Sequence, residues 1–191
     1  MKTTNSEMID TVRDGIVAAI KGSGDIVQAT VATITQTLAA VVKDAGELGA
    51  SFTDATADIV SGSIHAAEHV GADLGKASKG IIVGVLLGAR HTGAQVMDTI
   101  SHTAQVVVRD TAEVGGELGV VATGLVEGSI EAAKKLGISV EEAASAAAHG
   151  ALEAADKVGG TALETVRNAV TRTISGVKVV LKEPFNGKPG K

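Results

Sequence analysis

Two histidines and a glutamate stand at a spacing that could hold a zinc ion. His65, Glu68 and His69 form the pattern H-x-x-E-H. On a helix, histidines four residues apart lie on one face, where both rings could bind zinc while Glu68 serves as a general base. His65 and His69 are therefore the candidate metal ligands of this sequence, and the candidate chemistry is hydrolysis.

The element that must carry these residues belongs to a repeat marked by glycine. A glycine recurs every 22 residues, at Gly49, Gly71, Gly93, Gly115, Gly137 and Gly159. Apolar residues follow each of these glycines at spacings of three and four, which is typical of one face of an α-helix, and no alternation of period two competes with them. The sequence therefore predicts one helix for each 22-residue unit.

The helices can be joined in two ways. Twenty-two residues are two eleven-residue repeats, which would suit one long, continuous helix. The charges favour separate helices, because acidic residues gather in the first turn of each unit and basic residues in the last. Ser139 with Glu142 and Thr161 with Glu164 also have the spacing of helix-capping boxes. We therefore predict an all-α protein, an antiparallel helical repeat array or bundle of about eight helices of 18–20 residues, joined by tight turns at the repeated glycines.

A second set of glycines falls inside the predicted helices. These glycines are Gly62, Gly84, Gly128 and Gly150, each thirteen residues after a turn glycine. Glycine inside a helix costs about 1 kcal/mol relative to alanine, and a close approach of another backbone would offset that cost. We predict close packing of helices at these four positions. The apolar residues between Ile81 and Leu87 cover more than one side of their helix, which predicts a second covering layer from the same chain or from another copy.

The repeat also weakens the zinc hypothesis. The positions equivalent to His65 and His69 in three later units hold pairs of opposite charge, Arg109 with Glu113, Glu131 with Lys135, and Glu153 with Lys157. Such pairs at a spacing of four are typical of a solvated helix face. We therefore predict neither an enzyme nor a bound cofactor or metal, and no nucleophile, base and orienting acid share a recognisable spacing.

The ends of the chain define the expected domain. The strict pattern covers residues 49–180, and the two helices before it fit the register loosely. We predict a single helical domain over residues 1–183, with a last helix that carries Val177, Val179 and Val180 and stops before Pro184. Residues 184–191 are rich in lysine, glycine and proline and are expected to be a disordered basic tail.

Composition narrows the classes of partner. The chain has no cysteine, 1 % aromatic residues and a net charge of −5, so neither thiol chemistry nor nucleic-acid binding is expected. The longest strongly apolar run, residues 80–89, is shorter than the roughly 20 residues that a transmembrane helix needs. The first residues lack the apolar segment of a signal peptide, and we expect a cytoplasmic protein.

The 22-residue period over residues 49–180 resembles the amphipathic repeats of apolipoproteins, perilipins, synucleins and late-embryogenesis-abundant proteins. That resemblance implies a coat on a lipid, granule or membrane surface. The chain departs from those families because it lacks the Lys-Thr-Lys-Glu-Gly motif of synucleins, the prolines that punctuate apolipoproteins, and the aromatic anchors of interfacial helices. We therefore rank a non-enzymatic, self-associating structural protein, present as a homo-oligomer, above a coat protein.

Overall fold

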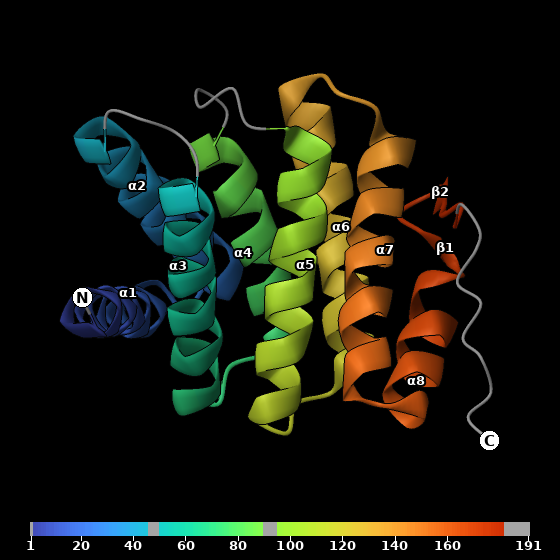
Figure 1. The fold of residues 1–191 in the computed structure, drawn as a ribbon, viewed down its shortest axis with the longest axis horizontal. Helices are drawn as coiled ribbons and strands as arrows, with labels where there is room; N and C mark the ends of the chain where they lie inside the picture. The colour runs from blue at the N-terminus through green and yellow to red at the C-terminus, as the bar shows by residue number, and fades with distance from the viewer. Residues whose placement is uncertain (1, 46–49, 90–94, 182–191) are drawn as a thin grey trace.

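The computed structural model describes residues 2–45, 50–89 and 95–181, and in this part of the chain eight helices pack into one array followed by a short hairpin (Figure 1). The elements are α1 (Lys2–Ser23), α2 (Ile26–Ala45), α3 (Ala50–His69), α4 (Leu74–Ala89), α5 (Val96–Glu113), α6 (Leu118–Leu136), α7 (Val140–Val158), α8 (Gly160–Val170), β1 (Thr173–Ile174) and β2 (Val177–Lys178). The predicted all-α architecture is confirmed. The helices range from 11 residues in α8 to 22 in α1, a wider spread than expected.

Three of the repeated glycines reverse the chain by the same geometry. Gly71, Gly115 and Gly137 have φ angles of 64°, 72° and 69°. The amide of the next residue donates to a carbonyl five residues back, from Gly116 to Thr111 at 2.9 Å and from Ile138 to Ala133 at 3.1 Å. This is the Schellman ending of a helix, which needs a left-handed residue that glycine adopts without strain. Gly49 and Gly93 lie outside the described residues.

Short polar side chains start several helices. The carboxylate of Asp25 accepts from the amide of Gln28 at 3.0 Å, and the carboxylate of Asp73 accepts from Lys76 at 3.1 Å. The hydroxyl of Ser139 accepts from the amide of Glu142 at 3.2 Å. Each acceptor satisfies an amide that has no partner within its own helix.

The capping box expected at Thr161 is wrong. Helix α8 begins at Gly160, with Gly159 at φ 143° as its N-cap. Thr161 therefore lies inside the first turn, where its carbonyl accepts a hydrogen bond from the hydroxyl of Thr165 at 2.9 Å.

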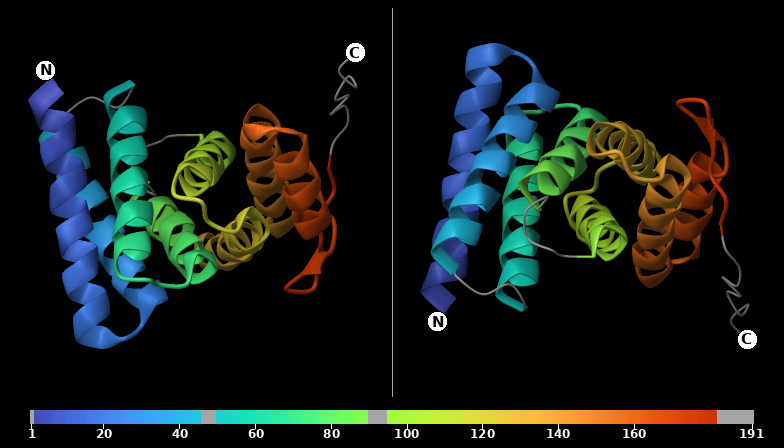
Figure 2. Two further views of the ribbon diagram at one scale, coloured as in Figure 1. Left: turned by 90° about the horizontal axis from the view of Figure 1, so that it is seen from below. Right: turned by 90° about the horizontal axis from the view of Figure 1, so that it is seen from above.

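The helices form two rows, with odd-numbered helices in one and even-numbered helices in the other. Figure 1 shows α3, α5 and α7 side by side and running in the same direction, and Figure 2 shows the two rows from below and above. Consecutive helices reverse direction, but the most extensive contacts join helices two apart, such as α2 with α4, α4 with α6, and α5 with α7. The closest neighbours in space are therefore not the closest in sequence.

The core between the rows consists almost entirely of Ala, Val, Ile and Leu. Helix α4 is buried nearly all round, including Ile81, Ile82, Val83, Val85 and Leu86. It touches α2 and α6 in its own row and α3 and α5 in the other. The second layer that the sequence required over α4 is supplied by the same chain.

The last predicted helix is wrong after residue 170. Helix α8 ends at Val170, and the chain continues as a hairpin in which Thr173 pairs with Lys178 and Ile174 with Val177. Ser175 and Gly176 form the two-residue loop, with φ angles of 49° and 82°. Two left-handed residues in succession give a loop whose twist matches that of the flanking strands. The predicted tail, 184–191, lies outside the described residues.

Within the described ranges, no helix combines the length and apolar character that crossing a membrane requires.

Candidate functional site

The four predicted close-packing glycines all lie at crossings between helices two apart. A Cβ on Gly62 of α3 would stand 2.7 Å from the carbonyl oxygen of Ile9 in α1. A Cβ on Gly84 of α4 would stand 2.9 Å from the Cβ of Ile34 in α2. These distances are shorter than real Cβ atoms tolerate, so the two helices approach as closely as they do only because the residue has no side chain.

The crossings farther along the chain are closer still. A Cβ on Gly128 of α6 would collide with the Cγ2 of Ile82 in α4 and stand 2.7 Å from the carbonyl oxygen of Lys79. A Cβ on Gly150 of α7 would collide with the backbone of Ser101 in α5, and one on Gly124 of α6 with the backbone of Gly75 in α4. In each pair the later helix presents glycine to the backbone of the helix two before it. Glycine also faces the following helix of a row, since Gly75 of α4 lies against α6 and Gly119 of α6 lies against Thr165 of α8.

Polar side chains also connect helices two apart. The hydroxyl of Ser61 donates to the carboxylate of Asp110 at 2.5 Å between α3 and α5, and Arg109 pairs with Asp110 at 2.8 Å. The side-chain amide of Gln105 donates to Glu153 at 2.5 Å between α5 and α7. These contacts fix the register of neighbouring helices, because a slide of one turn would separate the partners.

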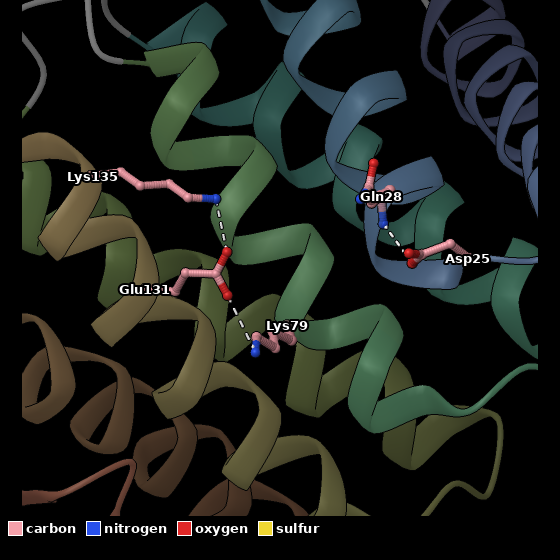
Figure 3. A network of polar contacts seen from close by, with 5 residues as sticks. All are labelled: Asp25, Gln28, Lys79, Glu131 and Lys135. Carbon is pink, nitrogen blue, oxygen red and sulfur yellow. Dashed lines mark hydrogen bonds and ion pairs between the residues drawn. The ribbon is translucent and has the colours of Figure 1, made fainter.

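Glu131 connects α6 to α4 through two lysines. Its carboxylate lies 2.8 Å from the Nζ of Lys135 in the same helix and 3.2 Å from the Nζ of Lys79 in α4 (Figure 3). The hydrogen bond from Lys135 is the largest cause that lowers the pKa of Glu131, and Lys79 adds to it. Figure 3 also shows the Asp25–Gln28 pair at the start of α2. The Glu131–Lys135 contact is the i, i+4 ion pair expected at this position of the repeat.

The histidine pair of α3 lies on a partly exposed helix face. His65 is half-buried, and Glu68 and His69 are exposed. Among the residues that the structure describes, no three or more His, Cys, Asp or Glu side chains come together in a group that could hold a metal ion. His65 and His69 therefore have no third ligand there, and a tetrahedral zinc site needs at least three protein ligands.

His102 of α5 has a pKa below the ordinary value of histidine. Burial lowers its pKa most, Arg109 lowers it further, and Asp54 of α3 opposes them. Its Nε2 atom is buried and finds no hydrogen-bond partner. The ring lines a small hollow with Phe52, Thr56 and other residues at the starts of α3 and α5. Asp98 lines the same hollow, which thus holds one imidazole and one carboxylate, and neither donates to nor accepts from the other at the Nε2 of His102.

The N-terminal end of the array presents helix faces that no other helix covers among the described residues. On α2 the exposed residues are Gln28, Ala32, Gln36, Ala39 and Ala40, and α2 has no charged residue from Ile26 to Val42. On α1 the adjoining exposed residues Gly15, Ala18 and Gly22 are flanked by the exposed charges of Asp14 and Lys21, and Gly15 lies against Thr33 of α2. Together these eight residues form a surface of small or uncharged side chains, which we call the N-terminal face.

The repeat shows what normally covers such a surface. Two units after Gln36, Ala39 and Ala40 come Gly80, Val83 and Gly84, all buried, and Gly80 and Gly84 lie against α2. Two units after Gly15, Ala18 and Gly22 come Ile59, Gly62 and Ala66, also buried, with Gly62 against α1. The N-terminal face therefore corresponds to the surfaces that elsewhere pack against the preceding helices.

The C-terminal end differs. Helix α8 exposes Glu164, Arg167 and Asn168, and the β1–β2 hairpin lies at the far end of the array from α1 (Figure 1). Strand β2 contacts α7, Val179 is buried and Leu181 packs against the core. A charged outer surface and a covering hairpin are what the terminal unit of a repeat array needs to meet water.

The fold and these surfaces define a two-row helical repeat array whose helices meet at glycine crossings. The chain matches no protein-family model and no curated protein. The sequence predicted the four crossing glycines and the turns at Gly71, Gly115 and Gly137, but it missed the N-terminal face. The uncharged run from Ile26 to Val42 was its signal, because a fully exposed helix face normally carries charge.

Proposed function

We propose that the protein is a non-enzymatic, self-associating helical repeat protein that serves as a scaffold or assembly component. The observation that supports the proposal is the N-terminal face. Its eight residues are exposed and uncharged, and six of them have buried counterparts two units later, whereas the counterpart of Ala32 is the exposed Lys76. Arrays of this kind need a polar terminal unit where they end in water, and α1 and α2 lack one over this face.

The N-terminal face would form the centre of a larger interface. Residues 28–40 of α2 extend about 18 Å along their helix and residues 15–22 of α1 about 10 Å. A stable complex buries about 800 Å² on each partner, so the contact would also include residues around the face. Alanine and glycine have little side-chain entropy to lose, so ordering them in an interface costs little.

The test is the molar mass in solution over a range of concentrations, measured by size-exclusion chromatography with light scattering. We expect an oligomer for the native chain and a shift toward monomer for Gln36→Glu combined with Ala40→Glu, because the interface would then bury unpaired carboxylates. The matched control is Asn168→Glu with Thr161→Glu, which adds the same charge to the exposed side of α8. A native chain that remains monomeric at high concentration contradicts the proposal.

A second experiment separates the proposed function from a coat on a lipid or granule surface. A coat would use the apolar stripes that α4, α5 and α6 bury against one another, so the array would have to open. Flotation with lipid vesicles, together with a change in helix packing detected by hydrogen exchange, would favour the coat over self-association.

A further inference from the structure

We propose that the C-terminal segment, residues 182–191, binds in a groove at the starts of α5 and α7 and connects the two helices as a strap. The inference concerns the opposite end of the chain from the N-terminal face, and it does not depend on self-association. Three observations support it: the lining of the groove, the point at which the described chain ends, and the charges of the groove and of the segment.

The groove lies beside the first turns of α5 and α7, which run in the same direction in one row (Figure 1). Its volume is about 660 Å³, within the range of about 300–1,000 Å³ that is common for ligand sites. Met97 of α5 and Ala146 of α7 are half-buried in its lining, and Val180 and Leu181 complete the apolar part. Val180 is 57 % exposed, so the groove leaves apolar surface that a short segment of chain could cover.

Carboxylates surround this apolar part. Asp98 of α5 and Glu141 and Glu142 of α7 line the groove and are exposed. The helix dipole favours an acid in each first turn, but among the described residues none of these three carboxylates forms an ion pair. The histidine of the lining, His149, lies 3.1 Å from Glu153. The rim of the groove therefore presents negative charge that is available to a cationic segment.

The sequence after Leu181 has the complementary composition. Residues 182–191 contain three lysines and one glutamate, together with Phe185, one of the two aromatic residues of the chain. An aromatic ring buries a large apolar area, and lysines on either side of it would meet the carboxylates of the rim. Composition alone predicted disorder for residues 184–191, whereas the groove gives the same residues a surface of matching polarity and opposite charge.

The segment needs no long connection, because Leu181 already lines the groove. An extended chain spans at most about 3.6 Å per residue, so Phe185 lies within about 14 Å of Leu181. Packed helices are about 8–10 Å apart, which places both α5 and α7 within that reach. A tether this short holds its segment at an effective concentration of about millimolar. The chain's own segment is thus favoured over a free peptide of the same composition.

A single fluorophore can report on the segment, because the chain contains no tryptophan or tyrosine. In the Phe185→Trp chain, a bound indole should emit at shorter wavelength than in the same chain unfolded by urea. A pocket covers about 70–90 % of what it holds, so acrylamide should quench the indole about threefold less than in the unfolded chain. Both values should stay constant on dilution, because the segment and the groove belong to one chain.

A blocked groove tests where the indole binds. Ala146→Glu, made in the Phe185→Trp chain, places a carboxylate in the apolar lining, so that binding of the ring would bury a charge. Quenching by acrylamide should then approach the value of the unfolded chain. Ala32→Glu, on the exposed side of α2, is the matched control and should leave quenching unchanged. Circular dichroism verifies that both variants keep their helices.

A second set of variants leaves the apolar lining intact and removes the charge of the rim. The triple variant, also in the Phe185→Trp chain, is Asp98→Asn, Glu141→Gln and Glu142→Gln. It should increase quenching, and so should salt added to the unsubstituted rim, because salt screens the attraction between exposed charges. The control neutralises three exposed acids elsewhere: Glu113→Gln, Glu117→Gln and Glu164→Gln.

The proposal is overturned if the indole of the folded Phe185→Trp chain is quenched as strongly as that of the unfolded chain. It is also overturned if the blocked groove and the neutralised rim both leave quenching unchanged, since the segment would then bind elsewhere. Protection that disappears on dilution would overturn it too, because the groove would then hold the segment of a second copy. The molar mass of the native chain remains the separate test of the proposed self-association.

Discussion

The α6–α7 turn and the α5–α7 crossing both depend on glycine, for opposite physical reasons. At the turn, Gly137 has φ 69° and ψ 30°, and a Cβ there would meet nothing within 4 Å. At the crossing, Gly150 sits in the middle of a helix, and a Cβ there would collide with the backbone of Ser101. The turn requires a backbone conformation, and the crossing requires an absent side chain. The same residue type at the same repeat spacing thus fulfils two requirements that mutation can separate.

The largest effect is expected at the crossings. Gly150→Ala and Gly124→Ala should each lower the free energy of unfolding by about 3 kcal/mol or more, because the obstructing atoms are backbone and the whole helix must move. Urea denaturation would measure the loss. Gly22→Ala in α1 is the control, since a Cβ there meets nothing within 4 Å, and it should cause no loss. An equally stable Gly150→Ala protein would contradict the close crossing.

A swap of substituents tests the comparison itself. Gly137→Ala should cost about 1–2 kcal/mol through the left-handed backbone, and Gly137→Asn should cost less, because asparagine tolerates that region better than alanine. At Gly150 the order should reverse, since asparagine is the larger side chain. The free energies of unfolding of the four variants, measured under one set of conditions, decide the matter. If both sites rank the substituents in the same order, one physical cause acts at both.

A smaller loss of stability is expected at the N-cap of α7, which belongs to the α6–α7 turn. Ser139→Ala removes the acceptor for the amide of Glu142 and should lower the free energy of unfolding by about 1 kcal/mol. Ser139→Asp keeps an acceptor and should retain most of the stability. Thermal unfolding of both variants is the measurement, and equal losses for alanine and aspartate would show that the cap contributes nothing.

The smallest effect concerns pH at the α3–α5 contact. The pKa of His102 is lowered in the folded protein, so the unfolded chain takes up a proton near pH 6.5 while the folded chain does not. Stability should therefore fall as pH decreases below about 6.5, down to the folded pKa. His102→Gln should flatten this part of the pH profile of the free energy of unfolding. An unchanged slope would assign the pH dependence to other groups.

Much of the helical architecture could be predicted because its signals are local. Gly137 follows a basic last turn and ends α6, and Ser139 precedes Glu142 by three residues and starts α7. Both signals depend only on residues within one helical turn. The row structure could not be predicted in the same way. The sequence shows that Gly150 needs a close neighbour, but its neighbour Ser101 lies two helices earlier, with α6 between them, and no local pattern identifies it.

The error at the C-terminus has an identifiable cause. Val177, Val179 and Val180 matched the apolar positions of the repeat, so the helix was extended through them. The competing signal was Ser175-Gly176 between β-branched residues, which is typical of a two-residue hairpin loop. The end of an array is where a repeat pattern is least reliable, because the terminal unit has one neighbour fewer to pack against.

The two-row arrangement sets which changes of chain length the fold can accept. Removing one 22-residue unit would send every later helix to the opposite row and reverse its direction, so that Gly124 would no longer meet Gly75. If two consecutive units were removed from the middle of the chain or inserted there, each remaining helix would keep its row and its direction. The smallest segment that can be gained or lost without rebuilding the core is thus a pair of helices, and natural or engineered variants of different length should differ by that step.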